Sequence, residues 1–254
     1  LLSHNDTSYS RMLYIMAADD AAKTLTIKFP GAVSGNYYLQ ISAAQHGRID
    51  SDLLQLHVHG SITSVSPLTG SKYGGALVTI TGENFSNDPL DNPVKIGDNY
   101  CYVITTSTTQ ITCRTDLLSA NTVGDQLVLV FLKTSEEAAT PNDDDINFTY
   151  ANPSAEVTDI QVEFDSTQFK HRVVVTGTGF DSSIELLVDG FQQTLESQTA
   201  TTAYFTLSTM STASTSNVVV YTSEGYPEGA EITHSLDVDP ALMAIDPAIG
   251  NAGG

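Results

Sequence analysis

The sequence predicts an all-β protein made of tandem β-sandwiches, and three observations support this prediction. Apolar and polar residues alternate at a period of two along most of the chain, which is the pattern of half-buried strands. Turn residues such as Pro30-Gly31, Gly97-Asp98-Asn99 and Asp189-Gly190 separate these runs. The chain of 254 residues is too long for one small sandwich and long enough for two to three modules of roughly 100 residues each.

The predicted strands are runs of β-branched and aromatic residues. They are Leu25–Phe29, Leu54–His59, Leu77–Thr81, Leu127–Leu132, Val157–Phe164, Val173–Val175 and Val218–Tyr221. Residues Ser10–Ala22 fit a short helix or a strand followed by a turn, because Met12, Ile15 and Met16 suit both. Many short strands with regular turns are typical of sandwiches.

An internal repeat sets the size of the module. Leu77–Phe85 (LVTITGENF) returns as Arg172–Phe180 (RVVVTGTGF), and the segment Val65–Gly75 returns as Ile245–Gly254. The module is therefore about 90 residues long, which is the size of an immunoglobulin-like sandwich. We expect boundaries near Gly60, near Asn152-Pro153 and near Asp239-Pro240.

The motifs of residues 61–150 resemble those of an IPT/TIG domain. The resemblance rests on Ser66-Pro67 to Gly74-Gly75, Val78–Phe85, Val94–Gly97, Cys101–Val103 and Gln110–Cys113. This is the immunoglobulin-like fold of plexins, the hepatocyte growth factor receptor and fibrocystin-like surface proteins. The family also includes enzyme accessory modules and Rel-type transcription factors, so the fold alone does not determine function.

The resemblance implies tandem immunoglobulin-like β-sandwiches of the IPT/TIG type, in four parts. Residues 1–60 match only the later strands of such a module, and 61–152 match a whole one. Residues 153–239 form a divergent module that keeps the Gly177–Phe180 turn, and 240–254 begin a further one. The resemblance also implies a disulfide between Cys101 and Cys113; free buried thiols are the alternative.

The charge balance disfavours several classes of partner. Ten Lys and Arg residues face 30 Asp and Glu residues, for a formal charge of −20, which argues against nucleic acid and against anionic membrane surfaces. No window approaches the ~20 apolar residues of a membrane helix, so we expect no membrane insertion in this segment. A surface rich in hydroxyl groups suits an extracellular or cell-surface location.

Sequons and a threonine-rich segment predict attached glycans. Asn5, Asn84 and Asn147 each begin an Asn-x-Ser/Thr sequon. The segment Thr194–Ser216 resembles an O-glycosylated stretch in composition. A threonine-rich strand pair is the alternative, and the two interpretations are compatible if the outward hydroxyl groups carry the sugar. The candidate O-glycosylation sites are Thr199, Thr201, Thr209, Thr212 and Thr215.

Two acidic loops and a histidine pair are the candidate metal sites. The loops supply the candidate Ca²⁺ ligands Asp88, Asp91, Asp143, Asp144 and Asp145. Neither loop follows an EF-hand spacing, so solvated loops are the simpler interpretation, and Ca²⁺ is the one candidate cofactor. His57 and His59 project from one face of a strand as a pair able to chelate a transition metal. A third ligand is not apparent, which favours a polar outer face.

No catalytic motif is present, so we expect a protein that is not an enzyme. The leading hypothesis is a structural or adhesive repeat segment of an extracellular, glycosylated fibre or surface coat. The alternative is the ligand-binding ectodomain of a receptor, which needs an exposed apolar or aromatic patch. A third hypothesis is an accessory module of a secreted carbohydrate-active enzyme.

The two ends of the chain add an expectation about assembly. The first module lacks its opening strands, and the chain stops where the next module's second strand should begin. Either further repeats cover both ends, or the tail 241–254 completes the first module of a neighbouring chain by strand addition. Both hypotheses imply end-to-end self-association into a linear assembly.

Overall fold

The structure, a computed structural model, forms two compact units, Leu1–Ala151 and Asn152–Gly254. It describes residues 2–4, 10–29, 31–43, 45, 47–49, 55–118, 123–141, 146–165, 170–207 and 217–229. The predicted boundary at Asn152-Pro153 lies at this division, whereas the one near Gly60 falls inside the first unit. The predicted further module, 240–254, lies outside the described residues.

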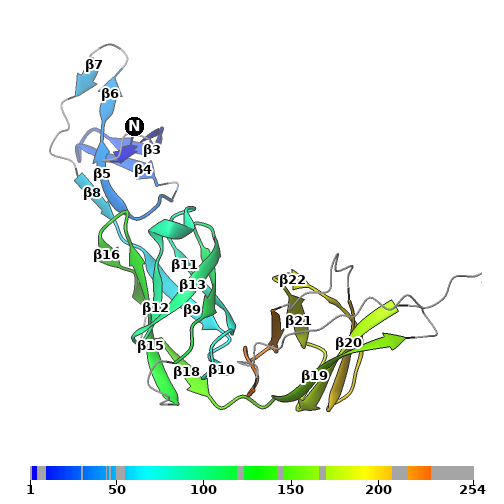
Figure 1. Cartoon of the computed structure of the whole chain (residues 1–254). Coiled ribbons are helices and arrows are strands. Elements are labelled where there is room, and N and C mark those ends of the chain that lie inside the picture. Colours follow the sequence, from blue (N-terminus) through cyan, green and yellow to red (C-terminus); the bar gives the residue numbers. More distant parts are fainter. Residues whose placement is uncertain are drawn as a thin grey trace, which may run out of the picture. The chain divides into compact units, whose positions relative to one another are not determined.

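The first part of the first unit consists of one four-stranded antiparallel sheet and two hairpins (Figure 1). Its strands are β1 (Leu2–His4), β2 (Ser10–Arg11), β3 (Tyr14–Asp19), β4 (Thr24–Lys28), β5 (Gly35–Leu39), β6 (Ile41–Ala43), β7 (Gly47–Ile49) and β8 (Gln55–Val58). The sheet has the order β2-β1-β5-β8, while β3 pairs with β4 and β6 pairs with β7. The segment that fits helix or strand in the sequence is therefore strand and turn.

Burial in this first part is uneven. Tyr37 on β5 and Val58 on β8 are buried together, and the Tyr37 hydroxyl donates a hydrogen bond to the Val33 carbonyl oxygen at 2.6 Å. The β3–β4 hairpin instead exposes its apolar side chains, with Ile15 62% and Leu25 47% exposed. Alternation predicts one buried face for each strand, but within the described residues this hairpin pairs only with itself.

The central module, residues 61–151, completes the first unit. Its elements are β9 (Ser61–Ser66), β10 (Thr69–Ser71), β11 (Leu77–Glu83), the 3₁₀ helix η1 (Pro89–Asp91), β12 (Val94–Ile96), β13 (Asn99–Thr106), β14 (Gln110–Thr115), β15 (Gly124–Leu132), β16 (Glu137–Ala138), β17 (Thr140–Pro141) and β18 (Asn147–Ala151). One hydrogen-bonded ladder runs β10-β18-β15-β12-β13-β14-β11-β9-β17, and β16 pairs with β15. The β10–β18 and β9–β17 pairs are parallel.

This ladder encloses the core of the central module. Val78, Ile80 and Phe85 are fully buried on or just after β11. Phe148 and Tyr150 on β18 are also fully buried and meet edge to face, with ring centroids 5.1 Å apart. Inward and outward residues alternate along β11 and along residues 99–102 of β13, as the period of two predicts.

The second unit is a smaller sandwich of two sheets that face each other (Figure 1). Its strands are β19 (Glu156–Asp165), β20 (Lys170–Thr178), β21 (Glu185–Val188), β22 (Phe191–Gln192), β23 (Thr194–Gln198), β24 (Thr202–Thr206) and β25 (Val218–Tyr221). One sheet has the order β19-β20-β24-β23 and the other β22-β21-β25. Val173, Leu186 and Phe205 are among the residues buried between them.

The all-β, immunoglobulin-like sandwich prediction is confirmed. Across the described residues the elements are strands, apart from the single turn of η1. No helix in that part of the chain has the length and hydrophobicity needed to cross a membrane.

Candidate functional site

The two cysteines form the predicted disulfide. Cys101 on β13 and Cys113 on β14 are joined with a Cα–Cα distance of 5.4 Å, and both are buried. In the β13–β14 ladder, Cys113 lies opposite Val103 and Cys101 lies opposite Thr115, so the bridge runs diagonally across the inner face. Disulfides of this kind persist in oxidising compartments.

Asn84, a predicted glycosylation site, has a structural role that the sequence did not reveal. It lies in the left-handed region with a φ of +64°. Its side-chain amide donates to the carbonyl oxygen of His59 at 2.8 Å, and its own carbonyl oxygen accepts from the backbone N–H of Ser34 at 2.8 Å. Asn84 therefore connects the central module to the strands that precede it.

The other predicted glycosylation sites lie in different settings. Asn147 is exposed at the start of β18, as expected from its place after an acidic loop. Thr199 and Thr201 are exposed in the turn between β23 and β24, where the Thr199 hydroxyl accepts from the backbone N–H of Thr201 and of Thr202. Asn5, Thr209, Thr212 and Thr215 lie outside the described residues. Glycosylation remains a prediction at all of these positions.

The carboxylates of the first acidic loop have local partners. Asp88 caps η1 by accepting from the backbone N–H of Leu90 at 2.9 Å. The Asp91 carboxylate accepts from the hydroxyl of Ser86 at 3.0 Å. Through these hydrogen bonds, both carboxylates stabilise the loop. Ca²⁺ binding at this loop stays a prediction. Asp143, Asp144 and Asp145 lie outside the described residues.

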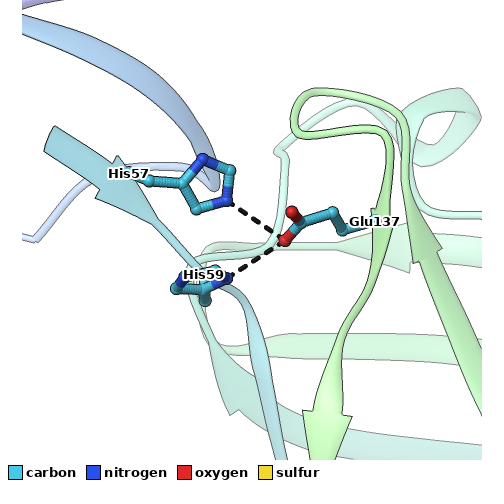
Figure 2. A group of neighbouring side chains, drawn as sticks. All are labelled: His57, His59 and Glu137. Atoms are coloured by element: carbon cyan, nitrogen blue, oxygen red, sulfur yellow. Dashed lines mark hydrogen bonds and ion pairs between the residues drawn. The ribbon is translucent and has the colours of Figure 1, made fainter. Parts of the chain in front are cut away.

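His57 and His59 lie next to a third polar group that the sequence did not indicate. Glu137 begins β16, directly after a turn in which Glu136 has a φ of +59°. Its Oε2 atom lies 3.1 Å from Nε2 of His57 and 3.0 Å from Nδ1 of His59 (Figure 2). The two imidazole rings are 4.2 Å apart between centroids. A third potential ligand, which is not apparent from the sequence, therefore lies beside the two histidines in the structure.

The environment of the cluster is partly open to solvent. The side chains of His57, His59 and Glu137 are 28%, 64% and 47% exposed, respectively. The pKa of the Glu137 carboxyl is lowered, mainly by the hydrogen bond from His57 and further by the one from His59, although partial desolvation opposes this. Glu137 is therefore held as a carboxylate facing two imidazoles.

The cluster is part of a close junction, which we define as His57–Gly60 with Ser34, Asn84, Thr134 and Glu137. Strand β8 ends at Val58 and β9 begins at Ser61, so only His59 and Gly60 connect them. Gly60 is buried, and a Cβ built on it would lie 2.1 Å from Cδ1 of Leu132. The hydroxyl groups of Ser34 and Thr134 are hydrogen-bonded at 2.7 Å.

Comparison with protein families decides the identity of the central module. The family model described as the IPT/TIG domain matches residues 61–150. Residues 61–150 are an IPT/TIG domain. The disulfide, the cluster residue Glu137 and the junction residue Asn84 all belong to this IPT/TIG domain, whereas His57 and His59 precede it. A search of curated proteins finds no match to the chain.

Solved structures similar to the chain are remote in sequence. The plexin A4 extracellular region, domains 1 to 10, matches at 17% identity and a TM-score of 0.42, covering 80% of this chain and 18% of that one. An auxiliary nutrient binding protein from Bacteroides ovatus matches at 18% identity and a TM-score of 0.31, covering 65% of this chain and 43% of that one. SGBP-B of the Bacteroides ovatus mixed-linkage glucan utilization locus, in complex with a mixed-linkage heptasaccharide, matches at 13% identity and a TM-score of 0.27. The match covers 84% of this chain and 53% of that one. The chain thus spans about a fifth of the plexin region.

Proposed function

We propose that this chain is a structural or adhesive segment of an extracellular surface assembly, in which adjoining β-sandwich modules hold one another in a set geometry. The observation that carries the proposal is the junction: two residues connect β8 to β9, and hydrogen bonds cross it from both sides. A connection this short and this well hydrogen-bonded fixes the orientation of the two neighbouring parts of the chain and passes mechanical load between them. A flexible Gly/Ser linker would not do so.

The energetics of the junction agree with a mechanical role. Asn84 donates to the His59 carbonyl oxygen and accepts from the Ser34 backbone N–H, while the Ser34 and Thr134 hydroxyl groups bond to each other. Each such hydrogen bond contributes about 1 kcal/mol net. Three of them acting together restrict bending between residues 31–58 and the IPT/TIG domain.

The disulfide and the acidic surface support the extracellular part of the proposal. The Cys101–Cys113 disulfide requires an oxidising compartment to form and persist. A formal charge of −20 keeps such a segment soluble and resists non-specific adhesion to other acidic surfaces. Glycans on Asn147, which is exposed, would extend this protection.

Distance measurements between spin labels test the junction. With labels on Gln55→Cys and Lys95→Cys, both exposed, pulsed electron paramagnetic resonance should give one narrow distance distribution. Asn84→Gly should broaden it, because glycine keeps the positive φ but loses the bond to His59. The matched control Asn87→Gly, in an exposed loop, should leave it unchanged. A broad distribution in the parent chain would remove the mechanical proposal.

Electron microscopy tests the fibre form of this role. Negative-stain images of native material at high concentration should contain linear assemblies whose axial repeat corresponds to a few modules. Isolated beaded monomers would argue against end-to-end self-association. They would shift the proposal towards the receptor ectodomain.

One observation favours that second candidate, a ligand-binding ectodomain. Tyr100 and Tyr102 on β13 are 52% and 60% exposed, and Leu129 and Phe131 on β15 are 40% and 44% exposed. Strand β12 lies between β13 and β15, with Lys95 paired to both Tyr100 and Leu129, so these side chains share one outer face. Exposed aromatic residues on one face are typical of contact surfaces.

A binding comparison distinguishes this candidate. The labelled chain should bind intact cells of its source organism more strongly than a Tyr102→Ser/Phe131→Ser double variant if the face binds a ligand. Phe191→Ser, which changes an exposed ring (73%) on β22 of the other unit, is the matched control. Equal binding by parent, double variant and control would eliminate the candidate.

A further inference from the structure

The group formed by His57, His59 and Glu137 has the geometry of an incomplete metal coordination shell. Both histidine nitrogens approach the same carboxylate oxygen, at 3.1 and 3.0 Å (Figure 2). One ligand atom from each of the three residues lies within 4.8 Å of the other two. Ligand atoms around a tetrahedral zinc ion, at about 2.0–2.2 Å from the metal, are about 3.3 Å apart. The two nitrogen–oxygen distances are already close to this spacing.

Asn36 on β5 orients the first ligand in the way that metal sites require. Its side-chain oxygen Oδ1 lies 2.6 Å from Nδ1 of His57. An amide oxygen only accepts hydrogen bonds, so Nδ1 carries the proton and Nε2 of a neutral His57 carries the lone pair. Metal-bound histidines commonly donate their second ring N–H to an oxygen in this manner.

The contact between Nε2 of His57 and Oε2 of Glu137 needs either a proton or a metal ion between the two atoms. In a neutral His57 oriented by Asn36, Nε2 directs its lone pair at the carboxylate oxygen of Glu137, 3.1 Å away. Two electron-rich atoms at this distance repel unless a proton or a metal ion lies between them. The same oxygen faces Nδ1 of His59, so one ion at this point would contact all three residues.

We propose that His57, His59 and Glu137 bind a divalent transition-metal ion, with zinc as the best chemical match. Two imidazoles and one carboxylate suit zinc, whereas Ca²⁺ and Mg²⁺ prefer shells made of oxygen ligands. The partial exposure of all three side chains leaves the fourth position of the ion to water or to a group from another molecule. This proposal stands independently of the proposed mechanical function.

The position of the site gives the bound ion a structural consequence. His57 lies on β8 and His59 in the connection that follows, while Glu137 lies on β16 of the IPT/TIG domain. An ion coordinated by all three therefore ties β8 to β16 across the junction. Binding should stabilise the first unit and leave the second unit unchanged.

Calorimetric titration of the metal-free full chain with ZnCl₂ tests the site. We expect one zinc ion per chain at this site and no competition from CaCl₂ or MgCl₂. Glu137→Gln should weaken the zinc affinity at least about tenfold, and His57→Asn/His59→Asn should abolish it. Asn36→Ala should weaken it by about tenfold to a hundredfold, the usual effect of removing a partner of a ligand. The control His171→Asn, on β20 of the second unit, should leave it unchanged.

A second measurement keeps the test independent of folding. Paramagnetic Co²⁺ should broaden the ring resonances of His57 and His59 before those of His171. Glu137 is exposed, so Glu137→Gln should retain the parent circular dichroism spectrum. Unchanged zinc affinity in a folded Glu137→Gln, together with Co²⁺ broadening centred on Asp88 and Asp91, would overturn the proposal in favour of diffuse binding to acidic groups.

Discussion

The ring of Phe85 packs directly against Gly82, because a Cβ built on Gly82 would lie only 2.4 Å from Cζ of Phe85. The same Cβ would lie 2.0 Å from the carbonyl oxygen of Ser61 on the neighbouring strand. Gly177 and Phe180 repeat the relationship in the second unit, with 2.6 Å to Cζ and 1.9 Å to a carbonyl oxygen of the neighbouring strand. The repeated motif is thus a packing device in which only glycine fits beneath the ring.

Replacing either glycine should destabilise its own unit. Gly82→Ala should lower the free energy of unfolding of the first unit by about 1–3 kcal/mol, because the clashing carbonyl belongs to the backbone and cannot move aside cheaply. Gly177→Ala should do the same to the second unit. Urea denaturation measures both effects. The neighbouring exposed residues provide controls, and Thr81→Ala and Thr176→Ala should each change stability by about 0.5 kcal/mol or less. Equal effects from glycine and threonine variants would contradict the packing argument.

Removing the disulfide should weaken the first unit alone. Cys101 and Cys113 are 12 residues apart in sequence, and a cross-link closing a loop of this size restricts the unfolded chain by about 3 kcal/mol. In a Cys101→Ala/Cys113→Ala variant, we expect the first unit to unfold at a lower urea concentration than in the parent protein. The urea midpoint of the second unit should stay the same. Reduction of the parent protein should reproduce the shift. An unchanged urea midpoint for the first unit would mean that the cross-link does not restrict the unfolded state.

Tyr150 should make the first unit sensitive to alkali. Burial raises the pKa of the Tyr150 hydroxyl to about 12, and the nearby carboxylate of Asp116 adds to the effect. The folded pKa exceeds the unfolded value of about 10, so the stabilisation is complete below pH 10 and is lost as the pH rises from 10 towards 12.

Substitution separates Tyr150 from the other tyrosines. Tyr150→Phe removes a long hydrogen bond of 3.4 Å to the Asp116 carbonyl oxygen and should flatten the alkaline loss of stability. The exposed Tyr100→Phe should not. Ultraviolet absorbance of tyrosinate, followed with unfolding, measures both. Identical alkaline profiles for the two variants would refute the assignment to Tyr150.

The ion pair between Lys170 and Glu196 should make the second unit sensitive to acid. The two side chains are 2.7 Å apart, and the pKa of Glu196 is lowered by the hydrogen bond from Lys170 first and by that from Thr206 second. A lowered folded pKa means that the stabilisation is present above the unfolded value of 4.5 and is lost as the pH falls below it.

Comparing two carboxylate variants checks this dependence. Glu196→Gln should destabilise the second unit by less than about 1 kcal/mol at neutral pH, and the difference from the parent should shrink as the solution is acidified. Glu185→Gln, an exposed carboxylate on β21, should show no comparable trend. Thermal unfolding at several pH values measures the differences. A pH-independent effect of Glu196→Gln would rule out the ion pair as its cause.

Local patterns in the sequence predicted much of the architecture, and their failures have a physical cause. The period of two correctly indicated β11 and β20, where both neighbours of each strand are present. It also correctly indicated β4 as a strand, but not that Leu25 would be exposed there. Alternation reports the two faces of a strand, whereas burial depends on what packs against each face.

The sequence by itself determined the all-β class and the sandwich modules, because these depend on periodicity within short stretches of chain. Its resemblance to a known family implied the IPT/TIG domain at 61–150 and the pairing of the two cysteines. Only the tertiary structure decided that Glu137 meets His57 and His59, which lie 80 and 78 residues away in sequence. It also decided that Asn84, a sequon residue, bonds to His59 across the junction. Such contacts follow from the long-range pairing of strands and the turns between them, which no local pattern encodes.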